Sequence, residues 1–483
     1  MSAPDVVVVG AGPNGLAAAV TMARAGLVVQ VLERGAVGGG ASTAELTLPG
    51  FRHDRGSAVH PMAVASPFFR RFRLIERTPF ITPRLSYAHP LADGRAALAW
   101  RSLERTADEL GPDGAAWRRL LAPLVQRAGE VGRLSTGPIL RVPPLPVATA
   151  WFGARVLEQG TPLWNLRWRG DAAPALLTGV QAHAIRRLPG LGPAAAGLAL
   201  AVAAHAGGWP IPVGGTQAIA DVLAADLLAH GGTIDTGVEV RGPADLPAAR
   251  AVVFDTGVPA LLDIAGGLLP DRLRARLARF TFGSGAAKVD LALDGPVPWT
   301  NIAAREAGTL HLGGTRAVIA AGEAAVDRGE HPADPYVLVA QPTVLDPSRA
   351  PAGKHVLWAY THVPSGSMVD PTARIIAAIE RFAPGFRDLI LASTASTAAD
   401  LARWNPNYGG GDIGTGSAGV VQLLARPTAS PDPWRLADGL YLCSAAAVPG
   451  PGVHGMGGYL AARSLLRHEY GIRTPPHLGP DDH

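Results

Sequence analysis

The first 33 residues constrain the fold more than any other part of the chain. An apolar run, Val6 to Val9, leads into a glycine-rich turn, a helical pattern that ends at Gly26, and a second apolar run from Val28 to Leu32. Short apolar runs bounded by turn residues predict buried strands, and a helix between two of them predicts a parallel βαβ unit. The chain is therefore expected to begin with an α/β unit of the Rossmann type.

The turn inside this unit has the spacing of a dinucleotide-binding loop. It reads Gly10-Ala11-Gly12-Pro13-Asn14-Gly15, and Glu33 closes the second strand. Glycines at these places permit a tight turn, the approach of a pyrophosphate and close packing of the helix, whose N-terminus favours anions. Glu33 would accept hydrogen bonds from ribose hydroxyls and would repel a 2′-phosphate. The unit predicts binding of NAD or FAD.

A second glycine loop favours FAD over NAD. The stretch Gly38-Gly39-Gly40-Ala41-Ser42-Thr43 follows Glu33 too closely to begin another nucleotide fold. A long flavin dinucleotide lying across the sheet would use such a loop, although three glycines in a row also occur in flexible turns. An NAD-dependent dehydrogenase therefore stays open as an alternative at this point.

Length and charge limit the class of protein. A chain of 483 residues suits two domains, or one domain interrupted by insertions. The net charge of +4 comes without a long basic tract, so nucleic acid is not an expected partner. Three arginines at 70, 71 and 73 lie beside three phenylalanines at 68, 69 and 72, which keeps peripheral contact with a membrane surface open. A solvated face is the favoured interpretation, and oligomeric state is not predicted.

The single cysteine and the N-terminus bear on the compartment. Cys443 alone excludes an intrachain disulfide and a cysteine metal site, as in a reducing compartment, and no metal is expected. The first strand begins at Val6, which leaves no room for a signal peptide. We expect a cytoplasmic protein that holds its flavin non-covalently, because Cys443 ends a strand and resembles a buried small hydrophobe.

The order of patterns predicts two domains, each assembled from separate segments. A hairpin is expected at residues 84–100 around Asp93-Gly94, followed by helical patterns typical of an inserted cap. The α/β rhythm resumes at Gly214-Gly215, with a strand expected at Thr233 to Arg241. We predict a discontinuous FAD-binding domain and an interleaved substrate domain of mixed sheet and helical cap. The first comprises residues 1–75, 206–275 and 430–483, and the second residues 76–205 and 276–429.

Several stretches of the sequence, taken in their order along the chain, resemble those of a known protein family. They are residues 6–33, 38–43, 49–54 (PGFRHD), 57–61 (SAVHP), 207–215 (GGWPIPVGG), 288–290 (KVD), 405–407 (NPN) and 452–456 (GVHGM). Together they resemble the phytoene desaturase-like FAD-dependent oxidoreductases. This is a branch of the amine oxidase-like flavoproteins that also includes carotenoid ketolases and pyridine nucleotide-disulfide oxidoreductase domain proteins.

The resemblance implies where FAD lies. The adenosine end would lie at the first glycine loop and Glu33, with an adenine contact near Val238, and the isoalloxazine near the C-terminal glycine loop. A helix that begins near His454 would aim free N–H groups at the flavin N1/O2 edge, where negative charge develops on reduction. The residues expected to contact FAD are Gly10, Gly12, Pro13, Asn14, Gly15, Glu33, Arg34, Gly39, Gly40, Ala41, Ser42, Val238, Ser444, Ala445, Gly452, Val453, His454 and Met456.

Three residues are candidates for catalysis. Lys288 lies on an apolar strand at a position similar to the lysine that holds a water against flavin N5 in amine oxidase relatives. His60 and His454 flank the predicted flavin loops. Each also has a structural interpretation, because Lys288 could pair with Asp290 and most histidines in such positions are structural.

The expected reaction is hydride transfer from a substrate to FAD. By resemblance, the substrate is a largely apolar isoprenoid or carotenoid-like molecule that is desaturated or dehydrogenated. No second Gly-x-Gly-x-x-Gly unit follows a strand, so electrons are expected to leave to oxygen, a quinone or another acceptor. Two alternatives stay open: an amine or natural-product oxidase of the same fold, and a non-catalytic FAD-binding protein.

Overall fold

Two β-sheets organise the structure, a computed structural model that describes residues 3–138 and 145–480. The first sheet has the strand order β16-β17-β10-β1-β2-β9 and is parallel except for the β16–β17 pair. Each of Val6 to Val9 in the central strand is buried, as a strand covered on both faces requires. The strands are β1 (Val6–Val9), β2 (Val29–Glu33), β9 (Thr233–Thr236), β10 (Ala251–Phe254), β16 (Arg435–Ala437) and β17 (Leu440–Leu442).

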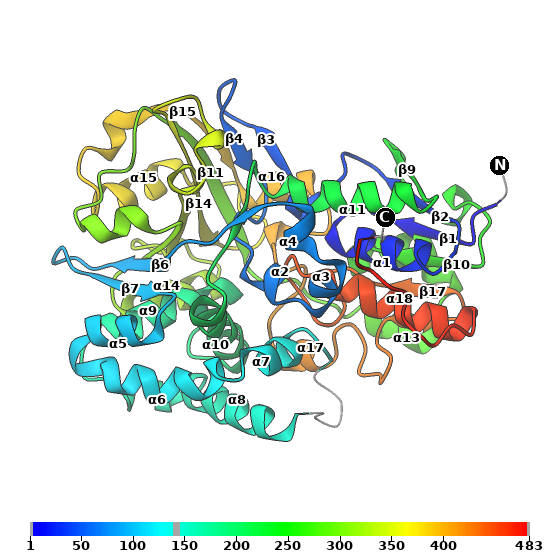
Figure 1. The fold of residues 1–483 in the computed structure, drawn as a ribbon, viewed down its shortest axis with the longest axis horizontal. Coiled ribbons are helices and arrows are strands. Elements are labelled where there is room, and N and C mark those ends of the chain that lie inside the picture. Colours follow the sequence, from blue (N-terminus) through cyan, green and yellow to red (C-terminus); the bar gives the residue numbers. More distant parts are fainter. Residues whose placement is uncertain (1–2, 139–144, 481–483) are drawn as a thin grey trace.

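Helix α1 (Pro13–Ala23) packs between α11 (Gln217–Ala229) and α18 (Met456–Glu469) beside this sheet (Figure 1). The contact with α18 is very close. A Cβ atom on Gly458 would lie 1.8 Å from the carbonyl oxygen of Asn14, and one on Gly457 would lie 2.3 Å from that of Cys443. Glycine at 458 therefore lets the C-terminal helix approach α1, and glycine at 457 lets it approach the chain at Cys443.

The second sheet is mostly antiparallel, with the order β15-β11-β14-β13-β12-β6-β7. One of its faces is apolar and packs on α15 (Thr372–Glu380), with Leu291, Leu357 and Ile375 in the shared core. The opposite face carries Lys288 and Tyr360, which are register partners on adjacent strands. The strands are β6 (Leu85–Pro90), β7 (Ala96–Trp100), β11 (Gly285–Leu293), β12 (Thr309–Leu312), β13 (Val337–Ala340), β14 (His355–Val363) and β15 (Ile390–Ser396).

A helical cap lies below the second sheet in the view of Figure 1. Its most apolar member, α10, forms the apolar stretch that contains Leu198 and Val202, both buried. Within the described ranges, no helix is both long and apolar enough to cross a membrane. The cap helices are α5 (Leu103–Glu109), α6 (Gly114–Val125), α7 (Ala128–Ser135), α8 (Pro146–Gln159), α9 (Ala172–Gln181) and α10 (Leu191–Ala206).

Shorter elements connect these layers. The ladders are β3 (Thr43–Glu45) with β4 (Arg52–Asp54) and β5 (Phe80–Ile81) with β8 (Ile211–Pro212). The remaining α-helices are α2 (Pro61–Ala65), α3 (Pro67–Phe72), α4 (Leu74–Arg77), α12 (Val258–Ala265), α13 (Asp271–Leu277), α14 (Arg316–Asp327), α16 (Ala398–Trp404) and α17 (Val420–Leu424).

The predicted fold class is confirmed, with an α/β nucleotide-binding unit, a mixed sheet and a helical cap. The expected strand at Thr233 to Arg241 is too long. It ends at Thr236 because Gly237 has a φ of +76° and turns the chain. Strand β15 was not anticipated, since its sequence ILASTAS lacks the apolar alternation of a half-buried strand. The division into two domains stays a prediction.

Candidate cofactor and substrate site

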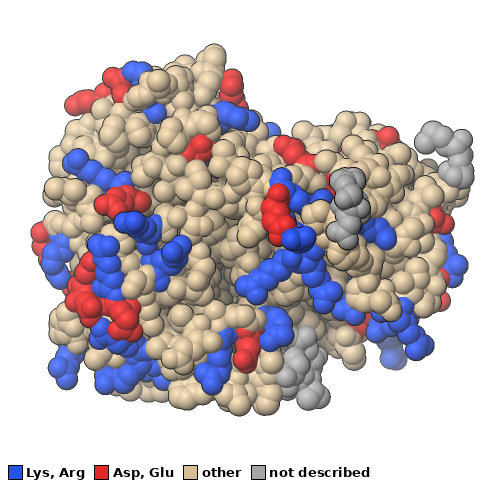
Figure 2. Space-filling model, viewed as in Figure 1, with Lys and Arg blue, Asp and Glu red and all other residues tan. Residues whose placement is uncertain are grey.

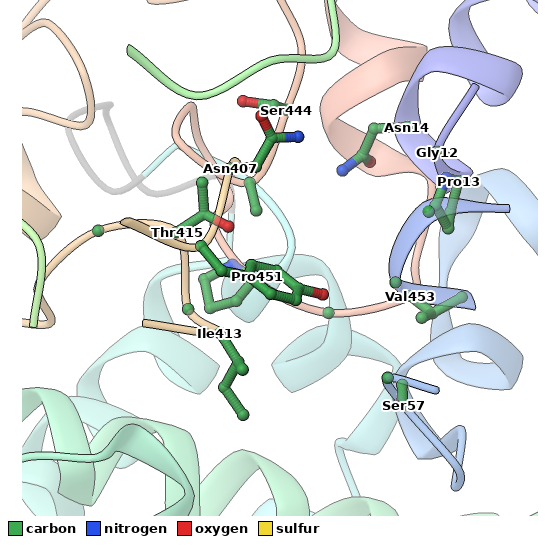
Figure 3. A pocket seen from close by; sticks show the side chains of 18 of the residues that line it. Gly12, Pro13, Asn14, Ser57, Asn407, Ile413, Thr415, Ser444, Pro451 and Val453 are labelled. Atoms are coloured by element: carbon green, nitrogen blue, oxygen red, sulfur yellow. The ribbon is translucent and has the colours of Figure 1, made fainter. Parts of the chain in front are cut away.

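One cavity of about 1670 Å³ reaches from the glycine loops to the cap and the second sheet. It exceeds the roughly 300–1,000 Å³ of an ordinary ligand pocket, and so has room for both a dinucleotide and a substrate. Figure 3 shows Gly12, Pro13 and Asn14 on one side of it and Ile413 and Thr415 on the other. Much of the wall between them comes from the loop that precedes α18.

The first glycine loop has no space for side chains. A Cβ atom on Gly12 would lie 2.6 Å from Oδ2 of Asp255, and one on Gly15 would lie 2.2 Å from the carbonyl oxygen of Gly10. Gly10 itself has a φ of +105°, which side-chain-bearing residues rarely adopt. Helix α1 begins at Pro13, its N-cap residue Gly12 supplies no side-chain cap, and the positive end of its dipole favours an anion.

The polar groups around this loop fit a dinucleotide. The Glu33 carboxylate lines the cavity and accepts hydrogen bonds from the backbone N–H groups of Ala11 and Gly35, each at 2.8 Å. A carboxylate offers about four lone pairs, so it can also accept from ribose hydroxyls. The Oδ1 atom of Asn14 is buried and has no partner among the described residues. These residues fit FAD, which supplies the redox chemistry when bound.

Asp255 is a cofactor-site residue that the sequence analysis missed. It follows β10, lines the cavity and accepts a 2.9 Å hydrogen bond from the Gly15 N–H group. Burial raises the pKa of its carboxyl to about 7, and the nearby charge of Glu33 adds to the rise. The sequence signal that could have identified Asp255 is the expected strand that ends at Phe254. The carboxyl ends of parallel strands lie at the same edge of a sheet, so an acid that follows this strand lies close to the glycine loop that follows β1.

The pKa of Asp255 predicts a pH dependence of stability. Between about pH 4 and pH 7, the folded protein holds a proton there that the unfolded chain releases, so the free energy of unfolding should fall as pH rises through this window. The upper bound is about 4 kcal/mol, since a tenfold change in proton affinity corresponds to about 1.4 kcal/mol. Asp255→Asn keeps an acceptor for Gly15 but cannot ionise.

Urea unfolding of the wild type and of Asp255→Asn at pH 5 and pH 8 checks this prediction. The wild type should lose more stability between the two pH values than the variant does. Equal losses in the two proteins would show that Asp255 does not titrate in this window.

The second glycine loop completes the cofactor side of the cavity. Gly39, Gly40 and Ser42 line it, and a Cβ atom on Gly39 would lie 3.2 Å from the Cα atom of Gly12, so the two glycine loops touch. A Cβ atom on Gly40 would lie 2.5 Å from the hydroxyl oxygen of Tyr408. A side chain at either position would therefore have to displace a neighbour, and Gly39 also has a φ of +50°, which favours glycine.

Most of the predicted cofactor residues come together on the cavity wall. These are Gly10, Gly12, Pro13, Asn14, Glu33, Arg34, Gly39, Gly40, Ser42, Val238, Ser444, Ala445, Gly452 and Val453. Four others lie behind the wall: Gly15, Ala41, His454 and Met456. Cys443 is fully buried in the strand region and is not on the wall. Direct contact with FAD stays a prediction for all of these residues.

Lys288 lines the cavity, but its ammonium group is already surrounded. Its Nζ atom donates to the carbonyl oxygens of Asp54 and Arg55, each at 3.0 Å, and forms an ion pair with Asp290 at 3.0 Å. An ammonium has three hydrogens, so these three oxygens leave no donor to hold a water at the flavin. The catalytic role stays a prediction, and the geometry favours a structural one.

His60 also lines the cavity, and its protonation follows from its neighbours. The Thr216 hydroxyl donates its only proton to the carbonyl oxygen of Ser57 at 2.6 Å, so it must accept from Nε2 of His60 at 2.8 Å. The Nδ1 atom then carries a lone pair and has no partner among the described residues. Burial lowers the pKa of His60 to about 4, so the ring is neutral near pH 7 and Nδ1 offers a lone pair as a hydrogen-bond acceptor.

His454 has both ring nitrogens bound to the backbone. Nε2 donates to the carbonyl oxygen of Gly450 at 3.2 Å, and Nδ1 accepts from the Met456 N–H group at 3.1 Å. The first N–H group of α18 is thus capped by His454 and is not free, in contrast to the expectation from the sequence. A catalytic role for His454 stays a prediction, and these contacts favour a structural one.

Arg426 and Asp412 hold the wall opposite the glycine loops, and neither was predicted from the sequence. Arg426 is buried and donates to the carbonyl oxygens of Gly414, Thr415, Gly416 and Ala445. The Asp412 carboxylate accepts three backbone N–H groups, from Gly283, Gly414 and Gly416. Most of these partners are backbone atoms of the neighbouring loop at residues 414–416, whereas Gly283 lies far away along the chain.

The other end of the cavity is apolar. Its wall includes Phe152 and Val156 of α8 and Leu200 of α10. His183 and His311 meet there through their Nε2 atoms at 2.8 Å, and His183 lines the cavity. Burial lowers the pKa of His183 to about 3 and that of His311 well below its usual value, so the pair is uncharged. This end suits an apolar, uncharged portion of a ligand.

Comparisons with known proteins agree with this geometry. Residues 5–82 match the FAD dependent oxidoreductase family. The chain is similar to pyridine nucleotide-disulfide oxidoreductase domain-containing protein 2 of Rattus norvegicus, with 26% identity over 96% of this chain and 93% of that protein. It is also similar to the structure of an oxidoreductase from Methanosarcina mazei, with a TM-score of 0.61 and 18% identity over 96% of this chain and 99% of that one.

A further similar structure is the cyclohexylamine oxidase of Brevibacterium oxydans, with a TM-score of 0.58 and 17% identity over 97% of this chain and 99% of that one. The chain has the fold of the FAD-dependent oxidoreductases. FAD is its cofactor, as the glycine loops and Glu33 predicted. The finer likeness to the phytoene desaturase-like branch stays a prediction.

Proposed function

We propose that this protein is an FAD-dependent oxidoreductase that removes hydride from a largely apolar small molecule, as a desaturase or dehydrogenase. The observation that carries the proposal is the continuous cavity, which joins the dinucleotide loops to apolar residues of α8 and α10. An isoprenoid or carotenoid-like substrate suits this lining. Oxygen, a quinone or another acceptor would take the electrons.

The residues around the cavity support this assignment of roles. The cap helices exclude water from the apolar end, and the wall held by Arg426 fixes one side of the cavity. When hydride leaves a C–H bond of the substrate, a proton must leave as well, either from a neighbouring heteroatom or from an adjacent C–H bond. The lone pair on Nδ1 of the neutral His60 ring is a candidate acceptor for that proton. Charged side chains of both signs are spread over the face of the molecule in Figure 2. Any contact with a membrane is therefore proposed to be peripheral.

An amine substrate is the second candidate, because solved relatives of the same fold include a cyclohexylamine oxidase. The carboxylates on the cavity wall argue against a cationic amine. Glu33, Asp255 and Asp412 accept backbone N–H groups, and Glu239 pairs with Arg34 and Arg241. Each already binds groups of the protein, so an ammonium ion would have to share a carboxylate that is already bound among the described residues of the wall.

The first test is the absorption spectrum of the purified protein, before and after release of its chromophore by heat. Flavin bands, with FAD in the supernatant, are expected. Apolar alcohols, polyenes and amines are then added anaerobically, and bleaching of the flavin band identifies a reductant. A protein that takes up FAD but is bleached by none of these would favour a non-catalytic FAD-binding protein.

A matched pair of cap variants tests the location of the substrate. Ala196→Trp places a large side chain on the cavity wall, whereas Ala154→Trp adds the same side chain at an exposed position of α8. The first variant should keep its flavin spectrum and lose at least about tenfold in the rate of bleaching, because a tryptophan fills the space of the substrate. The second should behave as the wild type. Equal rates in both variants would place the substrate elsewhere.

A further inference from the structure

Arg55 is a cation on the cavity wall without a hydrogen-bond or ion-pair partner among the described residues. Its guanidinium group forms no hydrogen bond or ion pair with any residue in the two described ranges. The Cζ atom lies 4.7 Å from the centroid of the Trp404 ring, which holds the side chain by a cation–π contact. The side chain is half-buried, so leaving it without a counter-charge has an energetic cost.

Every other cation on the described part of the wall has a partner. Arg34 and Arg241 pair with Glu239, Lys288 pairs with Asp290, and Arg426 donates to four backbone carbonyl oxygens. Asp290 also favours the charged form of Arg55, although burial has the larger effect and lowers the pKa of Arg55. Asp290 is itself held by Lys288 at 3.0 Å. Arg55 is therefore the wall cation that a ligand would neutralise.

The position of Arg55 is fixed by its own backbone. Its N–H group donates to the carbonyl oxygen of Ser42 at 2.8 Å, and its carbonyl oxygen accepts from Nζ of Lys288 at 3.0 Å. It thus lies where the second glycine loop meets strand β11 of the substrate sheet. Because the backbone of Arg55 is held on both sides and its guanidinium group lies over an aromatic ring, the side chain has less rotamer freedom to lose on binding.

We propose that Arg55, stacked on Trp404, binds an oxyanion of a ligand in the cavity, either a phosphate or a carboxylate. The planar guanidinium group offers two parallel N–H donors to two oxygens of such a group. Two sources supply this chemistry: the diphosphate of FAD, and an acidic end group on the apolar substrate. The second source rests on the proposed function and makes the substrate an amphipathic acid.

The test compares binding in Arg55→Met, which keeps an unbranched apolar side chain beside Trp404, with binding in the wild type. Two quantities are measured on the holoenzyme: the dissociation constant of FAD, from flavin fluorescence on dilution, and the affinity for octanoate, from perturbation of the flavin spectrum. Octanol is the neutral probe of equal length. The loss of a bidentate charged contact should weaken binding of the anion roughly tenfold or more.

Two variants control for other effects of the substitution. Arg403→Met removes an exposed arginine next to Trp404 that pairs with Asp400 and does not line the cavity, so it reports the effect of net charge alone. Arg55→Lys keeps the charge but loses the planar pair of donors, and should bind with intermediate affinity. If Arg55→Met is unstable, the affinity of Arg55→Lys for FAD and octanoate tests the proposal instead.

The outcomes separate the two sources. Weaker FAD binding in Arg55→Met identifies the cofactor diphosphate as the oxyanion. Unchanged FAD binding with loss of octanoate, and with octanol unaffected, identifies an acidic substrate. Unchanged binding of both overturns the proposal. None of these measurements needs turnover, so they stand apart from the bleaching assay that decides whether the protein is an enzyme.

Discussion

Replacement of Gly15 by alanine is expected to give a protein without bound FAD. The added Cβ atom would lie 2.2 Å from the carbonyl oxygen of Gly10, which is backbone and cannot swing aside. Relief of this clash moves the glycine loop or the first turn of α1, where the diphosphate is expected. FAD affinity should fall by about 100-fold or more, equivalent to about 3 kcal/mol. Flavin fluorescence on dilution, with the FAD-to-protein ratio after purification, measures the loss.

Gly267→Ala is the matched control. A Cβ atom at Gly267 would meet nothing within 4 Å, and its φ lies outside the left-handed region. This variant should bind FAD as the wild type does. A fully loaded Gly15→Ala protein would show that the loop can shift without loss of the cofactor, and would contradict the tight-turn interpretation of the first glycine loop.

Replacement of Lys288 by methionine is expected to lower the free energy of unfolding by about 3–5 kcal/mol. The Asp290 carboxylate would stay buried without its ion pair, and the carbonyl oxygens of Asp54 and Arg55 would each lose a donor. Replacement of both charged residues, as Lys288→Met with Asp290→Leu, should recover part of the loss, because no uncompensated charge is then left. Urea unfolding measures all three proteins.

The chain supplies its own control, since Lys288 and Lys354 are its only lysines. Lys354 pairs with Asp294 at the surface, where both side chains are well exposed. Lys354→Met should change the free energy of unfolding by no more than about 1 kcal/mol. If Lys288→Met instead has the stability of the wild type but reduces its flavin slowly, the catalytic interpretation of Lys288 is correct and the structural one is wrong.

The cofactor half of the site was largely predictable because its signals are local. The turn at residues 10–15, the acid at Glu33 and the loop at residues 38–43 lie within one βαβ unit and its exit. Because these residues are close in sequence, their spacing determines which backbone N–H groups lie beside the Glu33 carboxylate. The hairpin around Asp93-Gly94 was predictable for the same reason, as the turn dipeptide lies between the two strands that it joins.

The rest of the site could not be predicted because its partners are distant along the chain. Asp255 meets Gly15, and Arg426 meets carbonyl oxygens of residues 414–416 and 445, through backbone contacts that leave no periodic pattern. For Lys288 and His454 the residue type is known from the sequence. Which of their donors and acceptors stay free for catalysis depends on the groups that surround the side chain in the fold. Roles inferred from residue type alone therefore stay predictions.

The sequence by itself determined the βαβ unit and its glycine loops, because short-range sterics and hydrogen bonding encode them, and the resemblance of stretches along the chain pointed to FAD rather than NAD. Only the tertiary structure decided which polar groups are satisfied. It surrounded the Lys288 ammonium with three oxygens, left Nδ1 of His60 as a lone pair, and placed Arg55 on Trp404 without a counter-charge. The energy of a buried polar group is set by the partners that folding brings to it, and those partners come from every part of the chain.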